Sequence, residues 1–159
     1  VPVFAILSGS VFGAGLQLAL GADIRIASED VQVSIMETKW GLIPDMGISL
    51  FLPKLMRYDQ ALELTLTADL INAIEARNLG LITRVSKNPA DDVESNLLSL
   101  SMKSPDAIKS IKNLYTKIWP TLGKNGLKLE CALQRNLIGT ANQMEAVFAN
   151  FEKRKPKFK

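Results

Sequence analysis

The feature that most constrains this chain is a glycine-rich turn that follows a short apolar run near its start. Residues 3–7 read as a buried strand, residues 16–22 read as a buried helix, and Gly13, Ala14 and Gly15 lie between them. A turn from strand to helix leaves the first N–H groups of the helix without partners, and the helix dipole adds positive potential there. The sequence therefore predicts a backbone nest for an anion, either a phosphate or the oxyanion of a polarised carbonyl.

Two carboxylates follow the turn, Glu37 and Asp45, with a loop-like segment, 39–44, between them. Met36 and Trp40 lie close to Glu37 in the sequence and predict a partly apolar setting, which raises the pKa of a carboxyl group and suits a general acid or base. The alternatives are a surface acid at a strand end for Glu37 and a turn residue for Asp45. An oxyanion nest followed by acids indicates proton transfer beside a carbonyl.

The chain contains no histidine and a single cysteine, Cys131. Without histidine, Ser-His-Asp and Cys-His catalysis and most transition-metal sites are excluded, so we expect no metal. One cysteine excludes an intrachain disulfide and is typical of a reducing compartment, so we expect a cytoplasmic location. We expect Cys131 itself to be a small buried hydrophobic residue on a helix.

The positive charge of the chain, +3 in total, is most dense at the C-terminus, where five of the last seven residues are Lys or Arg. A solvated tail is the main interpretation of this run, and an anion-binding tail is the alternative. With one aromatic residue and no recognisable motif, the tail does not indicate nucleic-acid binding. No apolar run approaches the roughly 20 residues of a membrane span, so we expect no membrane contact.

The pattern of turns and apolar residues predicts alternating strands and helices to about residue 85 and helices alone thereafter. Capping signals at Asp59, Asn72, Ser104 and Asn142 start four of the helices. The expected strands are 3–7, 24–27, 31–35 and 81–85, and the expected helices are 48–55, 59–66, 72–80, 89–101, 105–119, 124–137 and 142–155. Stacked βα units followed by helices with spare apolar faces indicate a sheet core with an oligomerising appendage.

Three stretches, PVFAILSGSVFGAGLQLALGADIRIAS, METKWGLIPDMG and FEKRKPKF, resemble the enoyl-CoA hydratase/isomerase (crotonase) family. The resemblance covers essentially all 159 residues, but only the later part of such a domain. It implies an α/β fold with the C-terminal portion of a ββα spiral core in residues 1–85 and a helical oligomerisation region in residues 86–159. It also implies a homotrimer or a dimer of trimers.

Members of this family hold the carbonyl of an acyl-CoA thioester between two backbone N–H groups. The resemblance assigns one of them to Ala14, supported by Gly13 and Gly15, and no segment of the chain matches the other. Glu37 matches one catalytic glutamate of the hydratases, whereas Gln17 stands where they carry another. Because an amide does not take up a proton near neutral pH, this departure argues against efficient hydration.

Asp45 stands where dienoyl-CoA isomerases of the family carry an aspartate that shuttles protons together with a glutamate. The resemblance thus implies an enzyme that stabilises a thioester enolate, with Glu37 and Asp45 isomerising the double bond of an enoyl-CoA or dienoyl-CoA. Two alternatives stay open: an enoyl-CoA hydratase of fatty-acid degradation, and a non-catalytic acyl-CoA-binding or oligomeric scaffold.

The resemblance implies coenzyme A as part of the substrate and no further cofactor. Trp40 and Met46, the apolar residues closest to the acids, are expected in the acyl pocket, and Lys153 and Arg154 are expected at the CoA phosphates. Apolar residues at three- and four-residue spacing in the C-terminal helices predict a self-association surface. They are Ile108, Ile111, Leu114, Leu129, Leu133 and Leu137.

Overall fold

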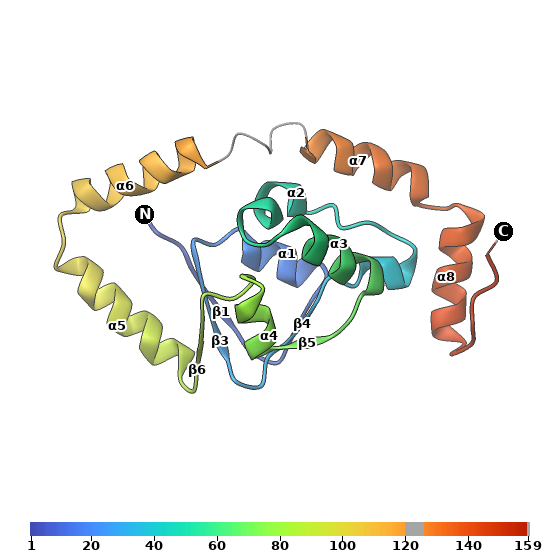
Figure 1. Ribbon diagram of the computed structural model, residues 1–159, viewed down its shortest axis with the longest axis horizontal. Coiled ribbons are helices and arrows are strands. Elements are labelled where there is room, and N and C mark those ends of the chain that lie inside the picture. Colours follow the sequence, from blue (N-terminus) through green and yellow to red (C-terminus); the bar gives the residue numbers. More distant parts are fainter. Residues whose placement is uncertain (120–125, 159) are drawn as a thin grey trace.

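Two small β-sheets form the first part of the molecule (Figure 1). The computed structural model describes residues 1–119 and 126–158. All strands of the first sheet are parallel, in the order β1 (Phe4–Leu7), β3 (Ile24–Ser28) and β6 (Arg84–Ser86). The second sheet has the order β2 (Ser10–Phe12), β4 (Gln32–Ser34) and β5 (Ile71–Asn72), with β2 parallel and β5 antiparallel to β4.

The core lies where the short helix α1 (Ala14–Leu20) packs against the strands. Leu16 and Leu20, one turn apart on α1, are buried together with Ala27 of β3 and Val33 of β4. β1, with the sequence FAIL, is apolar throughout, which is typical of strands in parallel sheets. The burial of α1 fixes the position of the glycine turn at its start.

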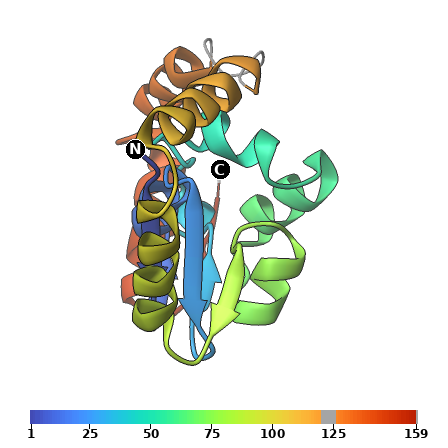
Figure 2. The same cartoon turned by 90° about the vertical axis from the view of Figure 1, so that its left-hand side faces the viewer.

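Helices cover the sheets and make up the rest of the chain. They are η1 (Glu37–Trp40), α2 (Ile48–Phe51), η2 (Leu52–Lys54), α3 (Tyr58–Thr67), α4 (Ala73–Asn78), α5 (Pro89–Ser101), α6 (Pro105–Ile118), α7 (Gly126–Leu137) and α8 (Ala141–Phe151). Figure 2 shows α5 alongside the strands, on the opposite side from α4. In Figure 1, α6 and α7 lie along the upper edge of the molecule, and α8 contacts η1. The described residues after β6 contain no strand, and the division at residue 85 stays a prediction.

A buried cation ties the first sheet together. Arg25 of β3 donates from Nε to the carbonyl of Leu81 at 2.7 Å and from Nη1 to the carbonyl of Ala22 at 2.7 Å. Burial lowers the pKa of this guanidinium, and the negative charge of Asp23 opposes that shift. These hydrogen bonds satisfy buried N–H donors of the guanidinium, and the bond to Leu81 fixes the chain before β6 beside β3.

Of the four helix starts that capping residues predict, two are observed and two are not. The capping box of Asn72 and Glu75 and the Ser104 cap are confirmed. The expected cap at Asp59 is wrong, because Arg57 precedes α3 and Asp59 lies in its first turn, paired with Arg57 at 2.5 Å. The expected start of the last helix at Asn142 is also wrong, because the Thr140 side chain accepts from the backbone N–H of Gln143.

Three short elements were not predicted from the sequence. They are β2, β5 and η1, which have only two to four residues each and so show no period. The helix that was expected over 124–137 is described from Gly126, and residues 124 and 125 lie outside the described residues. Cys131 on α7 is exposed, so the expectation of a buried cysteine is wrong.

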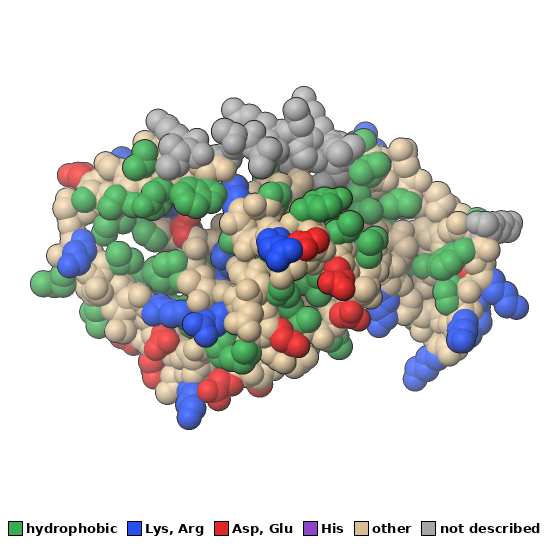
Figure 3. Space-filling view, viewed as in Figure 1, with side chains coloured by type: hydrophobic (Ala, Val, Ile, Leu, Met, Phe, Trp, Pro, Cys, Tyr) green, Lys and Arg blue, Asp and Glu red, His purple; other side chains and the backbone are tan. Residues whose placement is uncertain are grey.

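An apolar surface runs along α6, where hydrophobic side chains gather on the face seen in Figure 3. Ile111, Leu114, Tyr115 and Trp119 are each more than half exposed, and the rings of Tyr115 and Trp119 meet edge to face. Of the other positions expected in the self-association surface, Leu133 is exposed, Ile108 and Leu137 are half-buried, and the side chain of Leu129 lies outside the described residues. Within the described residues, no helix has both the length and the apolar character to cross a membrane.

Candidate active site

Glu37 is the centre of the candidate site, at the first position of η1 and shortly after β4. Its side chain is half-buried, and its Oε1 accepts a hydrogen bond of 2.6 Å from Nε2 of Gln17. Its other oxygen, Oε2, is buried and has no hydrogen-bond partner among the described residues. A buried acceptor without a partner is costly, so it marks a position where a ligand proton fits.

Gln17 of α1 holds that carboxylate in place and is itself almost fully buried, with 1% of its surface exposed. While Nε2 donates to Glu37, Oε1 accepts from the backbone N–H of Met46 at 2.8 Å. The bond from Met46 fixes which end of the amide faces Glu37, since only the carbonyl end accepts. Gln17 therefore links the glutamate to the loop that carries Asp45.

Burial raises the pKa of Glu37 above its ordinary value of 4.5. Hydrogen bonds from its own backbone N–H and from Gln17 oppose the shift, and the negative charge of Asp45 adds to it. The direction expected from the apolar neighbours in the sequence is confirmed. A carboxyl group with a raised pKa exchanges protons more readily near neutral pH than an exposed one.

The glycine turn lies directly beside Glu37. Gly13 has φ +49°, which favours glycine, and a Cβ built on it would crowd Oε1 of Glu37 at 3.2 Å. Ala14 and Gly15 open α1 and are exposed, and their N–H groups have no acceptor within the helix. We call the space between them and the acid the glutamate cavity. It measures about 220 Å³ and is lined by Phe12, Gly13, Ala14, Met36, Glu37 and Trp40.

A second, larger space lies on the other side of Gln17. This aspartate cavity measures about 680 Å³, and Gln17, Asp45 and Met46 line it together with apolar residues of β1 and α2. Asp45 and Met46 are both exposed. Trp40 lines the glutamate cavity and Met46 the aspartate cavity, and their expected role in an acyl pocket stays a prediction. Ala14, Gln17 and Glu37 are thus brought together, and Asp45 lies in the neighbouring space.

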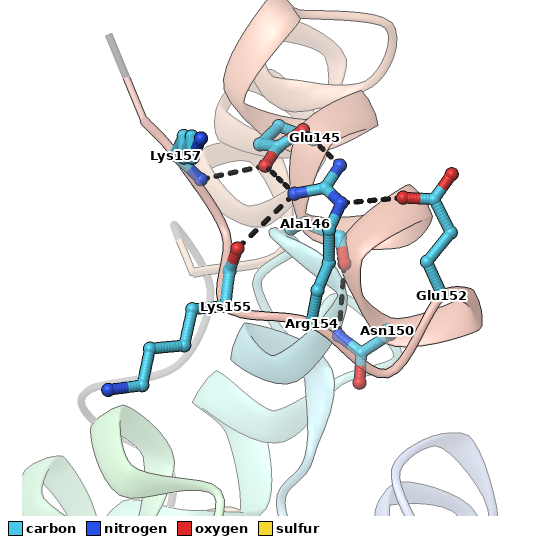
Figure 4. A network of polar contacts seen from close by, with 7 residues as sticks. All are labelled: Glu145, Ala146, Asn150, Glu152, Arg154, Lys155 and Lys157. Atoms are coloured by element: carbon cyan, nitrogen blue, oxygen red, sulfur yellow. Dashed lines mark hydrogen bonds and ion pairs between the residues drawn. The ribbon is translucent and has the colours of Figure 1, made fainter.

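The basic tail is folded back on α8 (Figure 4). The guanidinium of Arg154 pairs with Glu145 at 2.5 Å and with Glu152 at 2.5 Å, and Glu145 also accepts from the backbone N–H of Lys157. These contacts lower the pKa of Glu145 to about 2 and raise the pKa of Arg154. The guanidinium of Arg154 is thus paired with two carboxylates, and its expected role at a phosphate stays a prediction. Lys153 is exposed, and its role stays a prediction.

The bond of Gln17 to the backbone of Met46 was not predicted from the sequence. Nor were the contacts that three amide side chains of α7 and α8 make with the segment carrying the acids, those of Gln134, Gln143 and Asn150. No local signal predicts them, because each contact spans about a hundred residues of sequence. Among the described residues, no group of three His, Cys, Asp or Glu side chains is placed to hold a metal ion.

Comparison with known proteins gives the chain a family. The sequence profile of the enoyl-CoA hydratase/isomerase family matches residues 1–159. The peroxisomal Delta(3,5)-Delta(2,4)-dienoyl-CoA isomerase of Arabidopsis thaliana is 32% identical over 160 residues, which are 99% of this chain and 58% of the relative. A probable enoyl-CoA hydratase of Bacillus subtilis (strain 168) is 32% identical over 163 residues, 99% of this chain and 62% of the relative.

Solved structures agree with the sequence matches. A crystal structure of an enoyl-CoA hydratase/isomerase from Pseudoalteromonas atlantica T6c matches with a TM-score of 0.90 and 28% identity, over 99% of this chain and 64% of the other. An enoyl-CoA hydratase from Mycobacterium avium subsp. paratuberculosis K-10 matches with a TM-score of 0.88 and 27% identity. The crotonase-like α/β fold is thereby confirmed. The chain spans about 60% of the length of these relatives, and the matches do not confirm that it is only the later part of such a domain.

Proposed function

Because this chain belongs to the enoyl-CoA hydratase/isomerase family, we propose that it moves a proton beside the carbonyl of an acyl-CoA thioester. One observation carries the proposal: the buried Oε2 of Glu37 lacks a hydrogen-bond partner among the described residues, and Glu37 lines the same cavity as Ala14 at the start of α1. A base and a backbone donor that share one cavity match the two needs of enolate chemistry, a proton acceptor and a group that stabilises the oxyanion.

In the proposed reaction, ionised Glu37 removes a proton from the carbon between the thioester carbonyl and the double bond of a 3-enoyl-CoA. The electron pair of that C–H bond forms the new double bond, and the negative charge moves to the thioester oxygen. The N–H of Ala14 donates to this oxyanion. Return of the proton from Glu37 to the far carbon of the original double bond regenerates the carbonyl and completes the shift to a 2-enoyl-CoA.

The environment of Gln17 favours isomerisation over hydration. Hydration needs a group that takes a proton from water, and the amide of Gln17 has no such capacity near neutral pH. Both ends of that amide are also occupied, by Glu37 and by the backbone of Met46. The Arabidopsis relative that is named as a dienoyl-CoA isomerase agrees with this choice. If the substrate of this chain is a dienoyl-CoA, Asp45 would return the proton to a more distant carbon.

Hydration of 2-enoyl-CoA in fatty-acid degradation is the second candidate, because several relatives carry the name of hydratase. A non-catalytic acyl-CoA-binding scaffold is the third. For all three we propose coenzyme A as part of the ligand with no further cofactor, and a cytoplasmic location. The exposed apolar residues of α6 support assembly into a trimer or a dimer of trimers.

A substrate panel separates the candidates. The purified protein and its Glu37→Gln variant are assayed with 2-enoyl-CoA for hydration and with 3-enoyl-CoA and 3,5-dienoyl-CoA for isomerisation. We expect isomerisation by the parent and a loss of at least about 10²-fold in kcat in the variant, with CoA-ester binding retained. Fast hydration without isomerisation would support the second candidate. Thermal stabilisation by CoA esters without any turnover would support the third.

A further inference from the structure

The C-terminal helices α7 and α8 hold the segment that carries Glu37 and Asp45. The residues after Glu37 contact α8, and the residues before Asp45 contact α7. These helices were expected only as an oligomerisation region. Their contacts with the acid segment include directional hydrogen bonds, which an apolar association surface does not need.

Asn150 of α8 makes the shortest of these contacts. Its side-chain Nδ2 donates to the backbone carbonyl of Lys39 at 2.5 Å and to the carbonyl of Ala146, one turn earlier on α8, at 3.0 Å. Figure 4 shows the bond to Ala146 from close by. Both hydrogens of the amide are therefore used, one within the helix and one on η1. Lys39 follows Glu37 by two residues, so this bond fixes the short helix on which the base lies.

Two further features lock α8 against η1. Gly41 ends η1 with φ +69°, and a Cβ on it would lie 2.9 Å from Cα of Gln143, so glycine permits the close approach of the two backbones. The rings of Trp40 and Phe151 lie 6.3 Å apart and tilted. Since Trp40 lines the glutamate cavity, α8 supports one wall of the space that contains Glu37.

Gln134 of α7 holds the other half of the segment. Its side chain is buried, with 8% exposed, and its Oε1 accepts from the backbone N–H of Ile43 at 3.2 Å. Ile43 precedes Asp45 by two residues, and the next bonded N–H is that of Met46, held by Gln17. The loop is thus held at Ile43 from α7 and at Met46 from α1.

We propose that Asn150 and Gln134 are positioning residues for the reaction, acting through the backbone of the segment that carries Glu37 and Asp45. The proposal rests on the proposed function, since it assigns these amides a role in that same site. Neither side chain lines the glutamate or the aspartate cavity, so neither contacts substrate there. Their effect is on the placement of the acids, and displacements of about 1 Å in an active site reduce rates by as much as about 10²-fold.

The test compares variants that remove a side-chain amide at little cost in shape. Asn150→Leu removes the bonds to Lys39 and to Ala146, and Gln134→Met removes the acceptor for Ile43. Asn96→Leu on α5 is the matched control, because the amide of Asn96 also bonds to a carbonyl one turn earlier, that of Asp92, and lies on a helix that packs on β1, β3 and β6. Gln134→Glu is the conservative variant, since its carboxylate still accepts from Ile43.

We expect kcat to fall about 10- to 100-fold in Asn150→Leu and Gln134→Met, with KM little changed. Asn96→Leu should keep the kcat of the parent, and Gln134→Glu should retain more kcat than Gln134→Met. Amide hydrogen exchange of residues 37–46 provides a second readout, and Ile43 should exchange faster in Gln134→Met than in the parent.

The two readouts distinguish the possible failures. Unchanged kcat in both variants, or an equal loss in Asn96→Leu, would overturn the positioning role and leave the proposed function intact. If the parent shows no turnover, the proposed function fails, and hydrogen exchange still tests the structural part of the proposal. Faster exchange confined to residues 37–46 in the variants supports the fixing of this segment by α7 and α8, and unchanged exchange refutes it. If one variant fails to fold, the other, on a different helix, still decides the outcome.

Discussion

Replacing Gln17 with glutamate tests the central arrangement of the site. In the Gln17→Glu variant, one carboxylate oxygen still accepts from the backbone N–H of Met46, as Oε1 of Gln17 does at 2.8 Å. The other oxygen takes the place of Nε2, which lies 2.6 Å from Oε1 of Glu37. Two ionised carboxylates at that distance repel each other, so they will share one proton.

The size of the effect follows from the separation. The charge centres of two such carboxylates lie about 4 Å apart, and two unit charges at that distance repel by about 4 kcal/mol at an effective dielectric constant of about 20. One pKa unit corresponds to about 1.4 kcal/mol, so the two ionisations of the pair should separate by about 3 pKa units. The parent has one ionisation in this place, that of Glu37, with its pKa raised by burial.

The assay is the dependence of kcat/KM on pH for isomerisation and for hydration. In the parent, activity should rise with pH through the raised pKa of Glu37, because only the ionised form accepts a proton. In Gln17→Glu a second ionisation should appear above the first and give a bell-shaped profile, and hydration should gain relative to isomerisation. Gln32→Glu, on the exposed surface of β4, adds the same charge elsewhere and serves as control. A pH profile of Gln17→Glu identical to that of the parent would refute the close approach of the side chains at positions 17 and 37.

Three further predictions follow from named contacts. Ala14→Pro removes one N–H at the first position of α1, where proline is tolerated, so kcat should fall by about 10²–10³-fold while the midpoint of thermal unfolding stays near that of the parent; parent-like kcat would remove Ala14 from the oxyanion site. For Glu37→Gln, the raised pKa sets the sign of a stability difference. Burial favours the protonated form of Glu37, so the contribution of this group to stability is fully present below pH 4.5 and is lost as the pH rises through the raised pKa. The variant should therefore gain stability relative to the parent at neutral pH but not in acid, and a difference in urea unfolding that is independent of pH would contradict this. Leu114→Lys, on the apolar surface of α6, should weaken self-association in light scattering more than Leu66→Lys on α3, which is also exposed, and equal effects would exclude α6 as the interface.

The sequence predicted those parts of the site whose causes are local. The turn at Gly13 and the direction of the pKa shift of Glu37 depend on residues close by in the chain, and both are observed. The capping box at Asn72 was predictable for the same reason, since its partners lie three residues apart. Elements without a period, such as β2, were not, because three residues carry no pattern that separates a strand from a turn.

The parts of the site that were not predicted from the sequence depend on contacts between distant residues. Gln17 and Glu37 lie 20 residues apart, and their hydrogen bond exists because β2 and β4 are paired, which brings the start of α1 beside the start of η1. Asn150 lies 111 residues from its acceptor at Lys39, and no propensity or spacing relates the two. A buried amide such as Gln17 or Gln134 resembles any polar residue on an apolar helix until its partner is known. Such amides satisfy backbone groups of a loop that has no sheet or helix partners of its own. In this chain Gln17 and Gln134 hold the loop that carries Asp45 on both sides of that residue.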